Sequence, residues 1–350
     1  MTLVAAAAIA MLAACAPSAT WTPPRTGPSA SSSVSPSPAG PPTITIDFGG
    51  DVHFAGRTLS LLNDPATAFG SIKDELSSAD LSIVNLETAV TTRGTEEPKE
   101  FHFRAPPSAY EAIKAAGVDV VTLANNHALD YGRVGLTDTL ASAKAAGVPT
   151  VGAGENAAEA YKPWITEVKG VKIAFLGFNQ VTELASSWAA QDNRAGLAMA
   201  YPDQDRAVAA VKAAKAQADV VVVDMHWGQE YNECPIAIQK STAKKLADAG
   251  ATMIIGSHVH TLQGDGWQGK TFVAYGMSNF LWWYNDAQSN DTGVMRVTLT
   301  GSTITKTEFL PAYINRTTGQ PELVSGGEAD RIAKEYANLH GCTGLAAQSN

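Results

Sequence analysis

The sequence predicts an α/β domain built on largely parallel central strands, and three observations support this fold class. Short apolar runs rich in β-branched residues alternate along the chain with helical patterns. Glycine follows three of the Ala-rich helical patterns and precedes a strand, as is common after a helix end. Residues that can bind metal ions follow five of the predicted strands. Open α/β sheets carry their sites at the carboxyl ends of their strands, so we expect a site there.

The order of the elements follows from the periodicity. Strands are predicted at residues 43–48, 81–85, 118–124, 171–178, 220–225 and 252–255. Helices are predicted at residues 109–116, 135–146, 203–217 and 236–249, and Gly117, Gly147 and Gly250 follow three of them. From residue 271 the chain becomes β-rich, with strands at 271–280, 294–300 and 303–310 and a hairpin near Thr300 and Gly301. An amphipathic helix is predicted at residues 327–339.

Composition excludes several classes of protein. The chain has 350 residues, of which 45% are hydrophobic and 17% charged, as in globular proteins. With 25 Lys and Arg against 34 Asp and Glu, the net charge is -9, which argues against a protein that binds nucleic acid. Three cysteines are too few for a disulfide scaffold. No long apolar run follows the first fifteen positions, which argues against a protein with several membrane spans.

The first residues are predicted to direct and tether the chain. Residues 1–15 read as a lipoprotein-type signal segment, because a short apolar stretch ends in a Leu-Ala-Ala-Cys sequence that resembles a bacterial lipobox. Cys15 would then carry the lipid, and the protein would be extracytoplasmic and anchored to the bacterial cell membrane. Residues 16–42, rich in Pro and Ser, are predicted to be a flexible linker. No Lys or Arg precedes Arg25, so a start codon upstream of Met1 and an incidental cysteine both stay open.

Two alternatives are open for the remaining cysteines, Cys234 and Cys342. In an oxidising compartment a disulfide between them would close a loop of about a hundred residues and stabilise the fold by several kcal/mol. The other alternative is a pair of buried, unpaired thiols.

The predicted strand ends gather side chains of the types that bind metals. Neutral imidazole, carboxylate and amide oxygen together suit Zn, Mn or Fe. Residues at i and i+2 of an extended segment point the same way, so both members of an Asp-x-His or His-x-His pair can reach one site. Each residue alone has an ordinary alternative as a loop or turn residue, and His102 and His340, which lack such neighbours, are interpreted as ordinary. The strand-end residues are Asp51, His53, Asn85, Glu87, Asn126, His127, His226, His258 and His260.

Six blocks of the chain, in this order, carry a family resemblance: residues 50–57, 79–87, 123–132, 226–231, 256–260 and 275–280. They resemble the calcineurin-like metallophosphoesterases and, more closely, the bacterial capsule-synthesis CapA family of the poly-γ-glutamate capsule machinery. The resemblance extends over residues 43–315, a single large domain, followed by a helix and tail at 316–350. Ser278 stands where that family commonly has glycine.

The resemblance implies a four-layer α/β/β/α sandwich with two divalent ions (Mn, Zn or Fe) between its sheets. Asp51, His53 and His260 would hold one ion, and Asn126, His226 and His258 the other. Glu87 would bridge them, in place of the usual aspartate. His127 would be the acid–base residue, with Asp130 orienting it. Within the capsule family His53 is often replaced by an apolar residue, so this chain is nearer to the complete site.

The implied activity is metal-assisted hydrolysis during the synthesis, attachment or trimming of a surface polymer such as poly-γ-glutamate. Arg57 and Arg104 are candidates for binding an anionic polymer or phosphoester, or else exposed loop arginines. Glu230 is a candidate partner of His226 or a surface residue. The other candidates are core anchors or a platform for a polymer or sugar: Trp227, Trp267, Trp282 and Trp283.

Two other functions stay open. One is a non-catalytic polymer-binding or assembly subunit of a membrane synthase, and the other is a phosphatase or nucleotidase unrelated to capsule. The acidic net charge opposes binding of a polyanion at long range, so metals or a local basic patch would have to overcome it.

Overall fold

The structure is a computed structural model that describes residues 40–202, 204–287 and 289–349. The predicted lipidation site, Cys15, and most of the predicted linker lie outside the described residues. Pro41–Asn350 form one compact unit, so the C-terminal segment belongs to the same body as the α/β core. Among the described helices, none combines the length and apolar character that crossing a membrane requires.

The first sheet is centred on β1 (Thr43–Val52), the first predicted strand. On one side β1 pairs in parallel with β2 (Leu81–Leu86), and β5 (Val120–Thr122) and β6 (Thr150–Val151) continue that half. On the other side an antiparallel half is formed by β16 (Asp291–Thr300), β17 (Thr303–Ile314) and β18 (Pro321–Leu323). Thr300 pairs with Thr303, which confirms the predicted hairpin.

The second sheet is parallel in its centre, with antiparallel strands at both edges. Its parallel strands are β9 (Val171–Asn179), β11 (Val220–His226), β12 (Met253–Ser257) and β14 (Thr271–Met277). The edge strands are β8 (Trp164–Val168) and β13 (Leu262–Gln268). The predicted strand at 271–280 is interrupted at Ser278, which has a φ of 63° and separates β14 from β15 (Asn279–Leu281).

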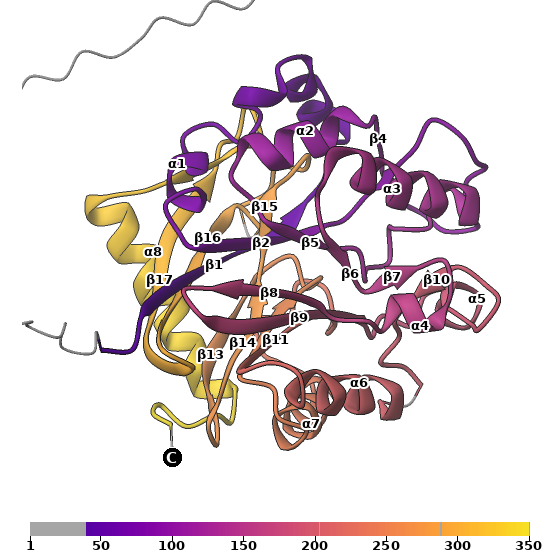
Figure 1. The fold of residues 1–350 in the computed structure, drawn as a ribbon. Helices are drawn as coiled ribbons and strands as arrows, with labels where there is room; N and C mark the ends of the chain where they lie inside the picture. Colours follow the sequence, from indigo (N-terminus) through magenta and orange to yellow (C-terminus); the bar gives the residue numbers. More distant parts are fainter. Residues whose placement is uncertain (1–39, 203, 288, 350) are drawn as a thin grey trace, which may run out of the picture. The chain divides into compact units, whose positions relative to one another are not determined.

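Helices cover the outer face of each sheet, so the predicted four layers are confirmed (Figure 1). Alternation along the strands explains the layering: Val222 faces the other sheet, whereas Val221 and Val223 face the helices. On the first sheet lie α1 (Ile72–Leu76), α2 (Ser108–Ala115) and α3 (Gly132–Ala146). On the second lie α6 (Asp205–Lys215) and α7 (Ala237–Asp248).

The apolar layer between the sheets also receives the C-terminal helix. Ile332 and Tyr336 of α8 (Gly326–Leu339) pack into the cluster that Phe48 and Phe175 contribute from the two sheets. A disulfide joins Cys234, after β11, to Cys342, with Cα atoms 5.7 Å apart. The shorter elements are η1 (Gly56–Asn63), η2 (Pro65–Thr67), β3 (Ala89–Val90), β4 (Arg104–Ala105), β7 (Ala153–Gly154), α4 (Ala157–Ala160), α5 (Ala185–Trp188), β10 (Gly196–Leu197) and η3 (His340–Cys342).

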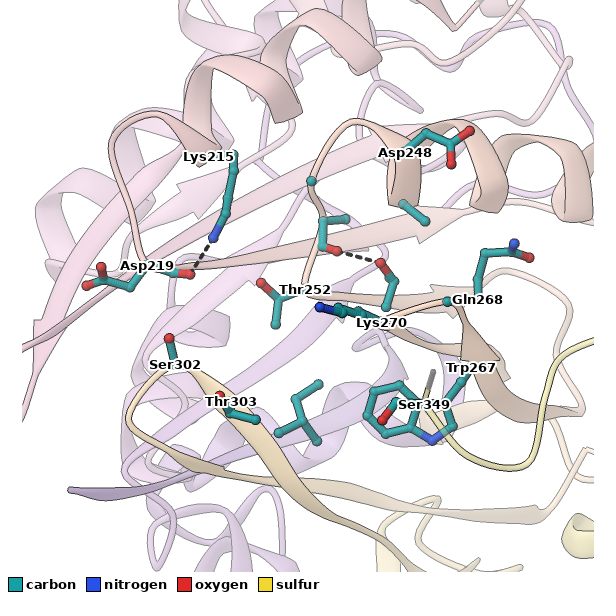
Figure 2. Close-up of a pocket in the computed structure, with 16 residues that line it drawn as sticks. Lys215, Asp219, Asp248, Thr252, Trp267, Gln268, Lys270, Ser302, Thr303 and Ser349 are labelled. Carbon is teal, nitrogen blue, oxygen red and sulfur yellow. Dashed lines mark hydrogen bonds between the residues drawn. The ribbon is translucent and has the colours of Figure 1, made fainter. Parts of the chain in front are cut away.

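Polar side chains close the amino ends of the parallel strands. Asp119, just before β5, accepts a hydrogen bond from the backbone N–H of Ser82 (2.8 Å), and Asp80 does the same for Thr45 (2.9 Å). In the second sheet Asp219 accepts from the N–H of Lys172 (2.9 Å). Figure 2 shows the pocket at this end of the second sheet, where Lys215 Nζ donates to the backbone carbonyl of Asp219 (2.7 Å).

Candidate metal centre

The carboxyl ends of strands from both sheets meet in one buried polar site. The first sheet contributes Asp51 from β1 and Glu87 directly after β2, and the second contributes His226 at the end of β11. His226 Nε2 lies 2.7 Å from Asn126 Oδ1 and 3.4 Å from Glu87 Oε1, so the two sheets are in contact here. Six of the seven predicted ligands are therefore brought together at the sheet ends: Asp51, Glu87, Asn126, His226, His258 and His260.

Three overlapping groups of side chains could hold a divalent metal ion, and one of them joins Glu230 to His258 and His260. In each group the ligand atoms lie within 4.8 Å of one another. Glu87, His226 and His258 form one group, which agrees with the ligands implied for the second ion. Asp51, Glu87 and His260 form another. Glu87 belongs to both, as expected for a bridging carboxylate.

The chemistry of the site fits a cation. Both carboxylate oxygens of Glu87 and Nδ1 of His258 are buried without a hydrogen-bond partner. Burial raises the pKa of Glu87 well above its ordinary value, and it does the same for Asp51, where the charge of Glu87 adds to the effect. Burial also lowers the pKa of His226 to about 4, so its imidazole is neutral and able to bind a metal at neutral pH. A divalent cation would stabilise the ionised carboxylates and satisfy the unpaired atoms.

Neighbouring polar groups orient the ligands. Asn279 Oδ1 lies 2.8 Å from His260 Nδ1 and Ser257 Oγ 2.9 Å from His226 Nδ1, while Asn85 donates to Asp51 Oδ1 (2.8 Å). The functional interpretation of the sequence did not include Ser257 and Asn279. The sequence could have indicated both, since each is a polar residue within two positions of the carboxyl end of a strand.

The backbone around the site adopts conformations that most residues avoid. His258 has a φ of 86°, His260 of 55° and Ser278 of 63°. A non-glycine residue in this left-handed region costs about 1 kcal/mol or more, and such strain clusters at functional sites. At Ser278, the left-handed backbone is one that glycine adopts without strain, which agrees with the glycine that the resemblance places there. A Cβ on Gly50 would lie 1.8 Å from the carbonyl oxygen of Ser278, so only glycine allows this contact.

His53 departs from its predicted role. Its Nδ1 accepts a hydrogen bond from the N–H of Ala55 (3.1 Å), and its Nε2 faces the N–H of Trp283 (3.5 Å). The ring is stacked on Phe103, with centroids 4.3 Å apart. Because both nitrogens face backbone donors, the structure leaves His53 outside the three ligand groups.

His127 and Asp130 form a dyad beside the ligands. His127 Nδ1 lies 2.7 Å from Asp130 Oδ2, and its Nε2 lies 3.9 Å from Glu87 Oε1. Sequence reasoning missed Lys99, whose buried ammonium lies 3.0 Å from Asp130, 3.3 Å from Glu183 and against the carbonyl of Asn126. Burial raises the pKa of Asp130 to about 7, although Lys99 opposes this shift.

The two predicted anion-binding arginines are engaged with the protein itself. Arg57 donates to the backbone carbonyls of Trp282, Tyr284 (2.9 Å) and Arg316. Arg104 lies over the ring of Tyr131, with its guanidinium carbon 3.4 Å from the ring centroid. The Arg57 guanidinium is thus occupied by backbone carbonyls, whereas Arg104 Nε is buried without a hydrogen-bond partner, and substrate binding by these two arginines stays a prediction.

The remaining candidates fall into separate positions. Glu230 lies 4.0 Å from His260 Nε2 and belongs to a possible ligand group with His258 and His260, so its metal-site neighbours do not include His226, the predicted partner. Trp227 is a core anchor that donates to the carbonyl of Tyr275 (2.9 Å). Trp282 packs against His53 and His260 at the edge of the site. His102 and His340 each contact a backbone carbonyl elsewhere.

Comparison with known proteins identifies the family. The sequence model of the family described as "Bacterial capsule synthesis protein PGA_cap" matches residues 45–284, which include every ligand named above. The chain belongs to this family. PGA_cap relatives include "Capsule biosynthesis protein CapA" of Bacillus anthracis, 28% identical over 83% of this chain and 72% of that protein. "PGA biosynthesis protein CapA" of Bacillus subtilis is 30% identical over 79% of this chain and 73% of that protein.

Two solved structures are similar to this PGA_cap chain at low sequence identity. A hypothetical protein from Thermus thermophilus has a TM-score of 0.49 and 17% sequence identity, over 77% of this chain and 98% of that one. A structure described as a novel phosphatase from Mycoplasma pneumoniae has a TM-score of 0.48 and 14% identity, over 85% and 99% of the two chains.

Proposed function

We propose that this chain is a metal-dependent hydrolase that acts in the synthesis, attachment or trimming of a capsule polymer such as poly-γ-glutamate. We further propose that Cys15 is lipidated and holds the domain outside the cell membrane. The family membership supports the capsule context, since the Bacillus relatives are described as capsule and PGA biosynthesis proteins.

The observation that carries the hydrolase proposal is the pair of buried, unpartnered oxygens on Glu87. A carboxylate in this position is costly unless a cation compensates it. His226, His258 and Asp51 surround it with further ligand atoms. Divalent ions in such a site would activate water and neutralise charge on the group being transferred.

The chain's own residues would complete the chemistry. The Nε2 of His127 faces Glu87, and its Nδ1 is held by Asp130, so the ring can exchange a proton with a leaving oxygen at Nε2. Lys99 fixes Asp130 and the backbone of Asn126 in the same network. Lys99 is thereby a positioning residue for His127.

Hydrolysis of bis(p-nitrophenyl) phosphate and of γ-glutamyl oligomers by the full chain, together with metal content, tests this proposal. We expect His258→Ala to lose both metal and hydrolysis, and His127→Ala to keep metal and lose hydrolysis by about a hundredfold or more. The control is Lys240→Ala, which removes a lysine that donates a hydrogen bond to the backbone carbonyl of Cys342. It should change neither metal content nor hydrolysis. Unchanged metal content and activity in His258→Ala would contradict the proposal.

One observation favours a second candidate, a non-catalytic polymer-binding or assembly subunit. Both nitrogens of His53 face backbone N–H groups, which leaves one of the two implied ion positions a ligand short. In that case His127→Ala would keep its function in cells, whereas the hydrolase requires that the same variant lose it.

A further inference from the structure

An open cleft borders the metal-binding residues, and its walls are aromatic. Its volume is about 440 Å³. His127 and His260 form its inner end, and Phe101, Tyr231, Trp283 and Tyr284 line its walls. We call these four side chains and the space between them the aromatic cleft. Any group that reaches His127 from this side passes between these rings.

Three of the four wall rings are unusually exposed for side chains of their size. Phe101 and Tyr284 are each 51% exposed and Tyr231 is 42% exposed. Large apolar rings that cluster at the mouth of a polar site indicate a surface that binds something, because a monomer normally buries them. They stand beside the candidate metal centre and on three separate segments of the chain, so the cluster is not the result of one exposed loop.

The aromatic cleft offers no positive charge to a polyanion. Among the described residues that line it there is no Lys or Arg, and the one charged side chain is Glu230. Nearby cations are already paired: Lys99 is buried against Asp130 and Glu183, and Arg57 donates to backbone carbonyls. Repeated carboxylates along a γ-glutamyl chain would therefore find no Lys or Arg partner among the residues that line this cleft.

The ring geometry favours a ligand that is not flat. Trp283 and Tyr284 are inclined at 53° to each other, and Tyr231 is inclined at 49° to His260. A planar base is held best between two parallel rings, whereas neither of these two pairs is parallel. A pyranose ring has C–H groups on its faces that pack on aromatic rings and hydroxyls around its edge. A carboxylate such as Glu230 can accept hydrogen bonds from those hydroxyls.

We propose that the aromatic cleft binds a neutral sugar unit of a glycan. This inference rests on the proposed function in one respect: the bound sugar places its linkage toward the metal centre. The substrate is then a linkage that includes a sugar, and any polyanion is a group attached to that sugar. The tension between an acidic protein and an anionic polymer disappears, because the protein recognises the neutral part.

Binding of three neutral tetrasaccharides (chitotetraose, cellotetraose and maltotetraose) to the full chain tests the proposal. Tryptophan fluorescence and calorimetry would be recorded with and without Mn²⁺. We expect at least one of them to bind, and Tyr284→Ala and Phe101→Ala to weaken that binding about tenfold each. The matched control is Tyr201→Ala, which removes an exposed tyrosine that does not line the cleft.

The outcomes separate this inference from the proposed function. His258 does not line the cleft, so His258→Ala should lose metal and keep sugar binding. Failure of all three sugars to bind a metal-loaded protein would overturn the inference and leave the hydrolase proposal intact. Tighter binding of a γ-glutamyl tetramer or of adenosine, weakened by Tyr284→Ala, would also overturn it. Sugar binding by a protein that takes up no metal would instead contradict the hydrolase proposal alone.

Discussion

The two ends of the parallel strands use the same residue types in opposite ways. At the amino ends, a carboxylate accepts a hydrogen bond from a backbone N–H of the neighbouring strand in three places, with N···O distances of 2.8–2.9 Å: at Asp80, Asp119 and Asp219. At the carboxyl ends, both carboxylate oxygens of Glu87 and one of those of Asp224 are buried without a hydrogen-bond partner. The amino ends are therefore complete within the protein, whereas the carboxyl ends need a partner from outside.

This difference shows how a function can be located without a ligand. Buried polar groups in folded proteins are normally satisfied, and the amino ends follow that rule. The carboxyl ends depart from it at several side chains, among them Glu87 and His258, and the backbone of His258 and His260 is also left-handed. Loss of hydrogen bonds and strained backbone at the same position indicate a site that trades stability for binding.

Removal of the Glu87 charge should have the largest effect on stability, and the sign of that effect should depend on whether metal is bound. In chelator, Glu87→Gln should be at least as stable as the wild type, because burial raises the pKa of Glu87 and opposes its charge. With Mn²⁺ at a thousand times its dissociation constant, the wild type should gain about 4 kcal/mol and the variant almost nothing. Thermal unfolding with and without Mn²⁺ measures both.

The equivalent change at the amino end is the control for that result. Asp219→Asn should shift the two unfolding temperatures equally, since Asp219 accepts one backbone hydrogen bond and precedes the amino end of β11, whereas the ligand His226 is at its carboxyl end. A metal-dependent shift in Asp219→Asn, or none in the wild type, would remove the distinction between the two ends.

Loss of the disulfide should have the next largest effect. Cys234 and Cys342 are 108 residues apart in sequence, so the bridge restricts a long loop in the unfolded chain. Cys234→Ser with Cys342→Ser should lower the free energy of unfolding by about 3 kcal/mol. Urea unfolding measures the loss, and metal content should stay at the wild-type value. A loss of metal would mean that the bridge supports the site directly.

A single bond at the amino ends should matter less. Asp119→Ala removes the acceptor of the Ser82 N–H and should cost about 1–2 kcal/mol, because that donor is left without its partner. Metal content and hydrolysis should not change. Urea unfolding and metal analysis of the same sample would show whether the amino ends stabilise the fold without affecting the site.

The smallest predicted effect is a pH dependence at Asp80. Burial alone would raise its pKa, but hydrogen bonds from Lys169 and Thr45 together lower it below 3.8. Its stabilising contribution is therefore complete above pH 3.8 and is lost as the pH falls through the lowered value. Asp80→Asn should cost up to about 1 kcal/mol at pH 7 and less at pH 3. An equal cost at both values in urea unfolding would show that its charge contributes nothing.

The fold was predictable because its signals are local. Alternating apolar runs located β1, β2, β9 and β11 within a few residues, and glycine marked helix ends such as Gly147, which has a φ of 70°. Short elements such as β3 and β10 were not predicted, because two-residue strands depend on contacts with distant segments.

The site was predictable in its ligands and less so in its surroundings. Asp51, Glu87 and His258 follow strands, so their meeting follows from sheet topology. Lys99 was missed because it comes from a long loop between β3 and β4 and reaches Asp130 only through the tertiary fold. The orientation of His53 depends on the backbone N–H groups of Ala55 and Trp283, and residue spacing contains no information on that.

The most direct test of this account is the metal content of the full chain purified without chelator and then incubated separately with Mn²⁺, Zn²⁺ and Fe²⁺. We expect about two ions per chain for at least one metal, because Glu87 belongs to two ligand groups. No bound ion above background with any of the three metals would contradict it, and the unpartnered oxygens of Glu87 would then need another explanation.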